Sequence, residues 1–137
     1  MTKTPSNEAE ASALLVLTSG TVKGTDHKAF NKWYTETHVP DMLTIPEIKS
    51  CRRYRVTSAR LYPGHIQEPQ YEYSAIYQIT ARTDADMHAV VKRIEELAAK
   101  SISVNESFDY SRTTATFLVP ISDVILKDPA YKHSGTH

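Results

Sequence analysis

The chain has 137 residues, of which 40% are hydrophobic and 23% are charged, and its 16 Lys and Arg residues balance its 16 Asp and Glu residues. This length suits one compact domain and is short for two. Because the net charge is zero, no positive field favours nucleic acid or an anionic membrane, and we expect neither as a partner. Eight tyrosines accompany only three phenylalanines and one tryptophan, which favours lined cavities or interfaces as much as a dry core.

The ends of the chain are polar. We expect a flexible tail over residues 1–10, one domain over 11–122 and a C-terminal extension over 123–137. The polar start lacks the apolar run of a secretory signal, and the single Cys51 has no intramolecular disulfide partner, so we expect a cytoplasmic protein. The apolar run 13–17 is far shorter than the roughly 20 residues of a membrane span, so we expect no membrane-spanning segment.

The first elements of the domain are a strand and a helix. The apolar run 13–18, followed by Ser19 and Gly20, predicts a short buried strand that ends there. Asp26 is placed to cap a helix over residues 26–38, and Pro40 is expected to stop it. The apolar stripe of this helix contains Phe30, Trp33, Tyr34 and Thr37.

Residues 50–57 and 70–80 are rich in tyrosine and β-branched or alternating residues and predict two strands. The segment between them contains Pro63, Gly64 and Pro69 and predicts a long loop. A capping-box pattern at Thr83 and Asp86 opens a helix over residues 84–100. A last strand is expected over residues 107–119, where Pro120 interrupts it.

The order β-α-β-β-α-β predicts an α+β, ferredoxin-like fold, with an antiparallel sheet that carries both helices on one face. Nothing in a chain of this length remains to cover the other face of the sheet. We therefore expect an identical chain to cover it, in a two-fold homodimer.

The segment 30–54 resembles the dimeric α+β barrel superfamily, and its EthD-like members in particular. The resemblance lies in Trp33-Tyr34, in His38-Val39-Pro40, and in a loop with a second proline that leads into an Arg- and Tyr-bearing strand. It implies a homodimer whose two sheets form a barrel, with a small-molecule pocket in each subunit. Members of this superfamily include cofactor-independent polyketide cyclases, dehydratase- or decarboxylase-like enzymes, and small monooxygenases with or without haem.

His38 is the first candidate for catalysis, because an imidazole titrates near neutral pH and can act as an acid or a base. At the predicted end of the helix, the negative end of the helix dipole would favour the protonated ring. The alternative is a capping histidine that bonds the last carbonyls. Asp41 can orient the imidazole beside a substrate, or it can cap the turn that follows.

Tyrosines supply the other candidate catalytic groups. Tyr34 lies one helical turn before His38, so a phenol and an imidazole can meet one substrate oxygen. Tyr71, Tyr73 and Tyr77 alternate along one predicted strand and point to one side of the sheet, either into a pocket or into a subunit interface. We select Tyr73 and Tyr77 as pocket residues. Trp33 is a candidate for substrate binding, although aromatic residues at this helical spacing are typical of a core.

Five basic residues with no acid among them occur within twelve positions: Lys49, Arg52, Arg53, Arg55 and Arg60. They can bind a carboxylate, an enolate or a phosphate, or lie on a solvated strand. Arg53 is the candidate for substrate binding. Cys51 is expected to be a packed thiol. The histidines show no metal-ligand spacing and the glycines form no phosphate loop, so we expect neither metal nor organic cofactor.

The sequence and the resemblance together favour a homodimeric, cofactor-independent enzyme that performs acid/base chemistry on an aromatic or polyketide-like molecule. A cyclisation, a dehydration or a related lyase or isomerase step is expected. The alternatives are a monooxygenase of the same fold and a non-catalytic dimeric binding or stress-response module.

Overall fold

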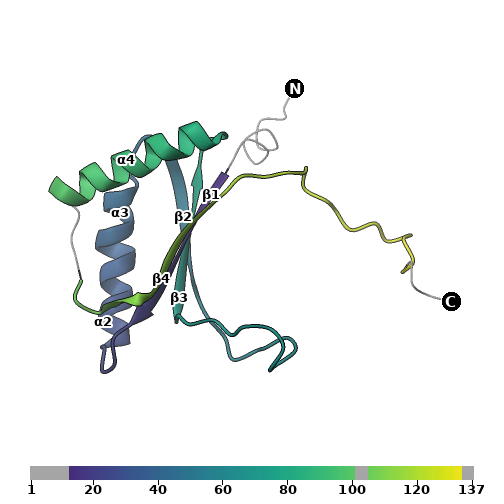
Figure 1. Ribbon diagram of the computed structural model, residues 1–137, viewed down its shortest axis with the longest axis horizontal. Helices are drawn as coiled ribbons and strands as arrows, with labels where there is room; N and C mark the ends of the chain where they lie inside the picture. The colour runs from purple at the N-terminus through teal and green to yellow at the C-terminus, as the bar shows by residue number, and fades with distance from the viewer. Residues whose placement is uncertain (1–12, 101–104, 134–137) are drawn as a thin grey trace.

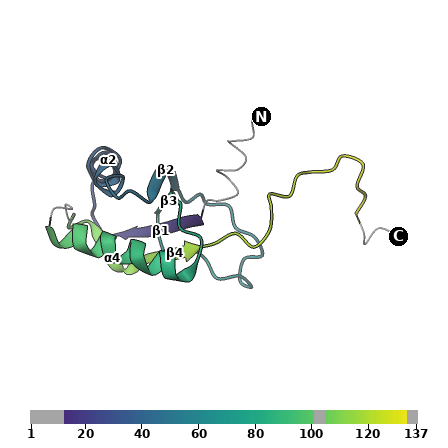
Figure 2. The same cartoon turned by 90° about the horizontal axis from the view of Figure 1, so that it is seen from above.

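The computed structural model describes residues 13–100 and 105–133, so the tail expected over residues 1–10 lies outside the described residues. In chain order the elements are β1 (Ala13–Thr21), α2 (His27–Trp33), the π-helical turn η1 (Tyr34–His38), α3 (Val39–Met42), β2 (Ile48–Arg55), β3 (Tyr73–Ile79), α4 (Asp84–Lys100) and β4 (Phe108–Leu118). The four strands form one antiparallel sheet in the order β2-β3-β1-β4. The helices lie on one face of it (Figures 1 and 2), which confirms the predicted ferredoxin-like α+β fold.

The core lies between the sheet and the helices. Register pairs Leu15 of β1 with Tyr77 of β3 and with Phe117 of β4, so these three side chains share the helix face. Phe30 and Val90 meet them from the two helices. The largest fully buried side chains are Tyr34, Tyr77, Phe30, Leu15, Ile79 and Val90. Two of the eight tyrosines are therefore core residues.

β1 is longer than the sequence predicts, because it continues through Ser19 and Gly20 to Thr21. The register with β4 shifts between Thr18 and Gly20, which marks an irregularity of the β-bulge kind. A Cβ atom at Gly20 would lie 2.6 Å from the Cβ of Arg112 on β4. Here glycine permits the close approach of a neighbouring strand and does not end the strand.

The helix does not stop before Pro40, which corrects the predicted end at residue 38. α2, η1 and α3 run on as one helical segment to Met42, drawn in blue in Figure 1. The amide of Val39 bonds the carbonyl of Tyr34 five residues back, which is the wider π turn. Pro40 follows directly after this π turn, inside the continuous segment, and has no N–H to donate to the preceding turn.

Both predicted helix caps are present. The Asp26 carboxylate accepts the amide of Ala29 at 3.1 Å, and the Thr83 hydroxyl accepts the amide of Asp86 at 3.1 Å. α4 has the predicted bounds. The strands agree with prediction to within three residues at each end, and the largest differences are the start of β3 at Tyr73 and the end of β1 at Thr21.

The second face of the sheet carries an apolar centre that no described helix covers. Leu14 and Val16 of β1, Ile76 of β3 and Leu118 of β4 alternate with the core residues and point to this side. We refer to these four residues as the open face. None of the described helices combines the length and the apolar character needed to cross a bilayer.

Candidate functional site

A cavity of about 250 Å³ lies between the helix face of the sheet and the helices. It is lined by Leu17, Ser19, Tyr34, His38, Met42, Ile94, Ala98, Phe108, Tyr110 and Thr113. The lining is mainly apolar, with a few hydroxyl groups and one imidazole. This is the usual composition of a site for a small organic molecule, in which few polar groups set the orientation of the ligand.

Tyr34 and His38 meet at one end of this cavity, as their spacing predicts. Their ring centroids are 4.8 Å apart and their planes are at 78°. Trp33 stacks on the imidazole, with centroids 5.1 Å apart and planes at 20°. The edge of the imidazole also approaches Phe108 of β4, at 6.3 Å between centroids. Aromatic rings from the helix and from β4 therefore hold the imidazole.

The protonation of His38 differs from the prediction. The helix continues past this residue, so the imidazole is not a cap and does not lie at the negative end of the helix. Burial instead lowers its pKa below the ordinary 6.5, an effect that Asp41 opposes in part and Arg53 reinforces. The ring is therefore neutral at neutral pH.

The Nδ1 atom of His38 is buried and has no hydrogen-bond partner among the described residues, so Asp41 does not hold it. A proton on this atom would lack an acceptor, which favours the tautomer that carries its proton on Nε2. Nδ1 then keeps a lone pair that no described residue uses, on a ring that lines the cavity.

Arg53 lies on the far side of Tyr34 and does not line the cavity. Its guanidinium carbon is 4.2 Å from the centroid of the Tyr34 ring, a cation–π distance. Nη1 donates to the Asn31 carbonyl at 3.3 Å and to the Thr35 hydroxyl at 3.2 Å. These bonds join β2 to the helix where it widens into the π turn. Arg53 therefore supports the backbone that carries Tyr34 and His38.

The structure does not bring Tyr73 and Tyr77 into the cavity. The Tyr77 hydroxyl is buried without a hydrogen-bond partner, and burial together with Tyr34 and Cys51 raises its pKa. Tyr73 contacts His27 instead, with 2.8 Å between its hydroxyl and Nδ1. Both tyrosines are on the helix face of β3, away from the open face. Burial also raises the pKa of the Cys51 thiol.

Several cavity residues were not predicted. Ser19 follows the predicted strand 13–18, yet it continues the alternation of Leu15 and Leu17 on the helix face. Ile94 and Ala98 fall within the predicted helix 84–100, where helical spacing does not distinguish a cavity lining from a core. A second hollow, of about 190 Å³, shares Leu17 and Ile94 with the first and extends it along the helix. Within the described residues, no three His, Cys, Asp or Glu side chains gather as metal ligands.

These features define a ferredoxin-like α+β domain with a cavity between its helices and its sheet. An EthD family protein from Bacillus halodurans has a similar structure, with a TM-score of 0.51 and 14% identity over 80% of this chain and 99% of that chain. This likeness supports, at the level of the fold, the EthD-like resemblance seen in the sequence.

Two further structures show weaker likeness. A hypothetical Arabidopsis thaliana protein has a TM-score of 0.49 and 13% identity over 84% of this chain and 93% of that chain. HapK from Hahella chejuensis has a TM-score of 0.39 and 14% identity over 90% and 99%. No protein-family model matches the sequence, and no curated protein is similar enough to count as a relative.

Proposed function

We propose that this chain is a homodimeric enzyme that performs acid/base chemistry, without metal or organic cofactor, on an aromatic or polyketide-like molecule. The observation that carries the proposal is the pair formed by His38 and Tyr34 at the end of a mainly apolar cavity. His38 is the base that removes a proton from carbon, and Tyr34 donates a hydrogen bond to the oxygen on which negative charge develops.

The protonation states favour these roles. Burial keeps His38 neutral at neutral pH, and its Nδ1 lone pair is not used within the described part of the chain. Burial also raises the pKa of Tyr34, an effect that Ser19 and Arg53 oppose, so the phenol keeps its proton and can donate it in a hydrogen bond. One group can thus accept a proton while its neighbour stabilises the enolate.

The lining favours a flat, apolar substrate that carries oxygen. Phe108 and Tyr110 from β4 and Met42 from α3 supply apolar surface, whereas Ser19 and Thr113 supply hydroxyl groups. Aromatic rings bind well beside such faces and edges. A cyclisation, a dehydration or a related lyase or isomerase step on such a molecule begins with removal of a proton next to a carbonyl.

The homodimer is supported by the open face. Its four apolar side chains form the centre of a sheet surface that the described helices leave uncovered. Apolar patches of this kind, with polar residues around them, are typical of protein interfaces. A second copy related by a two-fold axis places apolar centre on apolar centre.

Proton exchange tests the acid/base chemistry without knowledge of the natural substrate. The probe is a phenyl-substituted 1,3-diketone in D₂O. His38 removes the proton between the two carbonyls, the electron pair moves into an enolate, and a deuteron from the exchanged imidazolium returns to the carbon. Exchange is followed by NMR, and we expect the wild-type chain to exchange the probe faster than buffer alone does. In His38→Gln this acceleration should fall by at least about 100-fold.

His65→Gln is the matched control, because His65 lies in an exposed loop away from the cavity. It should exchange the probe at the wild-type rate. Equal rates for His38→Gln and wild type would show that His38 is not the base. Oxygen consumption with the probe, or a red preparation, would point instead to the monooxygenase alternative. Binding of the probe without any exchange would favour the non-catalytic module.

A further inference from the structure

The C-terminal arm, residues 119–131, overlaps the C-terminal extension expected over residues 123–137. It leaves the end of β4 and extends away from the domain (Figures 1 and 2), although its sequence is rich in apolar residues. Ile121 is 97% exposed, Ile125 86% and Leu126 80%. Isolated exposed apolar residues are ordinary, but a run of them on an extended segment marks an interaction surface.

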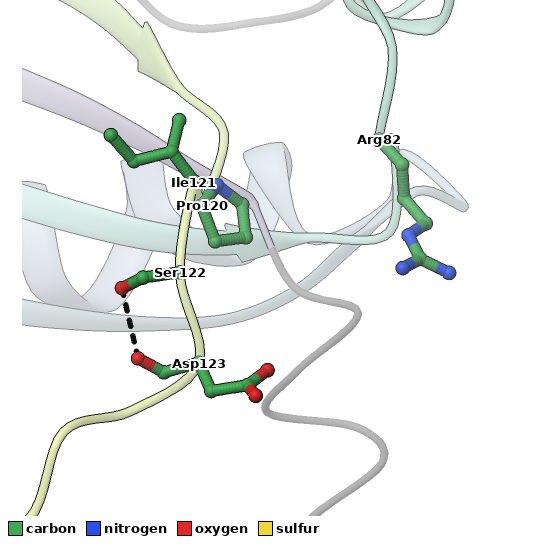
Figure 3. A pocket seen from close by; sticks show the side chains of 5 residues that line it. All are labelled: Arg82, Pro120, Ile121, Ser122 and Asp123. Carbon is green, nitrogen blue, oxygen red and sulfur yellow. Dashed lines mark hydrogen bonds between the residues drawn. The ribbon is translucent and has the colours of Figure 1, made fainter.

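Within the described part of the chain, the apolar side chains of the arm stay exposed. A hollow of about 430 Å³ lies between Arg82, which follows β3, and the first residues of the arm. Figure 3 shows Ile121 pointing away from Arg82, and the Ser122 hydroxyl donates to the neighbouring carbonyl of Asp123 at 2.9 Å. Fully extended, thirteen residues span about 40 Å, which is enough to cross another domain of this size.

The arm projects on the side of the sheet that the helices leave open, and so does the loop 56–72. Figure 1 shows the two segments on either side of the space in front of the open face. The loop carries exposed apolar residues too, at Leu61, Tyr62 and Ile66. The arm and the loop therefore both lie within reach of a partner that covers the open face.

The charge of Arg52 favours one of two possible orientations of the two-fold axis between two such sheets. Arg52 lies on the open side of β2 in the central row of the sheet, where register aligns it with Ile76, Val16 and Thr116. A two-fold axis across the strands would bring Arg52 against its own copy, which is unfavourable for like charges. An axis parallel to the strands instead opposes Arg52 to Thr116 and Ile76 to Val16.

With the axis parallel to the strands, the end of β4 in one copy lies beside the beginning of β2 in the other. β2 carries Lys49 at that end and Arg52 three residues further along, both exposed and without an ion pair in the described part of the chain. The arm that follows β4 carries carboxylates at Asp123 and Asp128, and one Lys, Lys127, lies between them. Opposite charges thus come together at the point where the arm leaves its own sheet.

From this placement we infer that the C-terminal arm of each protomer packs along the β2 side of a second copy of the same chain. Ile121, Ile125 and Leu126 bury against that copy, and Asp123 and Asp128 pair with its Lys49 and Arg52. The inference rests on the homodimer of the proposed function. It adds two symmetry-related arm contacts to the contact between the two open faces.

A charge exchange tests the arm. The variant Asp123→Lys/Asp128→Lys and the variant Lys49→Glu/Arg52→Glu each oppose like charges in their homodimers. In a 1:1 mixture the heterodimer restores both pairings, because each arm meets a β2 of opposite charge. By sedimentation equilibrium, we expect each variant alone to dissociate about 10-fold to 100-fold more readily than wild type, and the mixture to regain near wild-type affinity.

Two further variants separate the arm from the open face. Removal of residues 119–137 should weaken dimerisation about 100-fold and leave the circular dichroism of the domain unchanged, and Ile125→Ser/Leu126→Ser should act in the same direction. Val16→Asp should break the dimer through the open face. A dimer that Val16→Asp breaks but arm removal does not weaken overturns the arm contact and keeps the homodimer. No rescue in the mixture, or a monomeric wild-type chain, also overturns the inference.

Discussion

The imidazole of His38 lies edge-to-face against the phenol of Tyr34, 4.8 Å between centroids, across a π-helical turn that continues into Pro40. The same turn holds the imidazole under Trp33 and away from solvent. The position of the pair in the helix, and not a helix end, therefore sets the charge of His38. Changes at this pair should therefore alter the stability of the chain, its activity on the probe and the pH dependence of its stability.

The first prediction concerns acid stability. Burial lowers the pKa of His38 in the folded chain, despite Asp41, whereas in the unfolded chain it titrates near 6.5. Below this pH the unfolded state binds the extra proton, so stability falls as the pH drops towards the lowered pKa. We expect the free energy of unfolding to decrease less from pH 7 to pH 5 in His38→Gln than in wild type, as measured by urea denaturation. His65→Gln should keep the wild-type slope, and equal slopes in all three proteins would contradict the buried, neutral imidazole.

The second prediction separates the phenol of Tyr34 from its ring. Tyr34→Phe keeps the buried ring, which is 2% exposed, and should change the free energy of unfolding by less than about 1.5 kcal/mol. It should nevertheless slow probe exchange about 10-fold to 100-fold, because the hydrogen bond to the enolate is lost. Tyr34→Ala should lose about 3–5 kcal/mol of stability. Unchanged exchange in Tyr34→Phe would remove the phenol from the mechanism.

The third prediction concerns the buried hydroxyl of Tyr77. This oxygen makes no hydrogen bond of good geometry among the described residues and has only the Cys51 thiol and the Tyr34 hydroxyl beside it, so the folded state bears its desolvation with little compensation. We expect Tyr77→Phe to leave the free energy of unfolding unchanged or to raise it by about 1 kcal/mol, with exchange of the probe unaffected. A clear loss of stability in chemical denaturation would mean that the hydroxyl is bonded in solution.

The fourth prediction concerns the crossing of β1 and β4. An added methyl at Gly20 would lie 2.6 Å from the Cβ of Arg112, whose guanidinium binds Glu72, Asp109 and the Thr21 carbonyl. Gly20→Ala should therefore destabilise the chain by about 1–3 kcal/mol, because strand and ion pairs must shift together. Gly24→Ala is the comparison: no atom lies within 4 Å, so only its positive φ of 86° opposes the change. A Gly20→Ala variant that loses no thermal stability would show that the close contact carries no strain.

Local interactions explain what could be read from the sequence alone. The caps at Asp26 and Thr83 bond amides three residues away, and the stripe of α4 repeats every turn, so both are visible in a short window of residues. The order of the elements follows from such windows, and with it the fold. The approach of Tyr34 to His38 was equally predictable, because one helical turn joins them.

Only the tertiary structure decided the rest, because it depends on residues that are distant in the chain. Gly20 of β1 lies against the side chain of Arg112 from β4, which leaves no room for a side chain at position 20. Arg53 of β2 donates a hydrogen bond to the helical segment that contains the π turn and Pro40. Strand alternation placed Tyr73 and Tyr77 on one face, yet only the packing of the helices showed that this face is closed around Tyr77 and open beside His38. Alternation specifies a side of the sheet, whereas the room left on that side is set by every side chain that packs there.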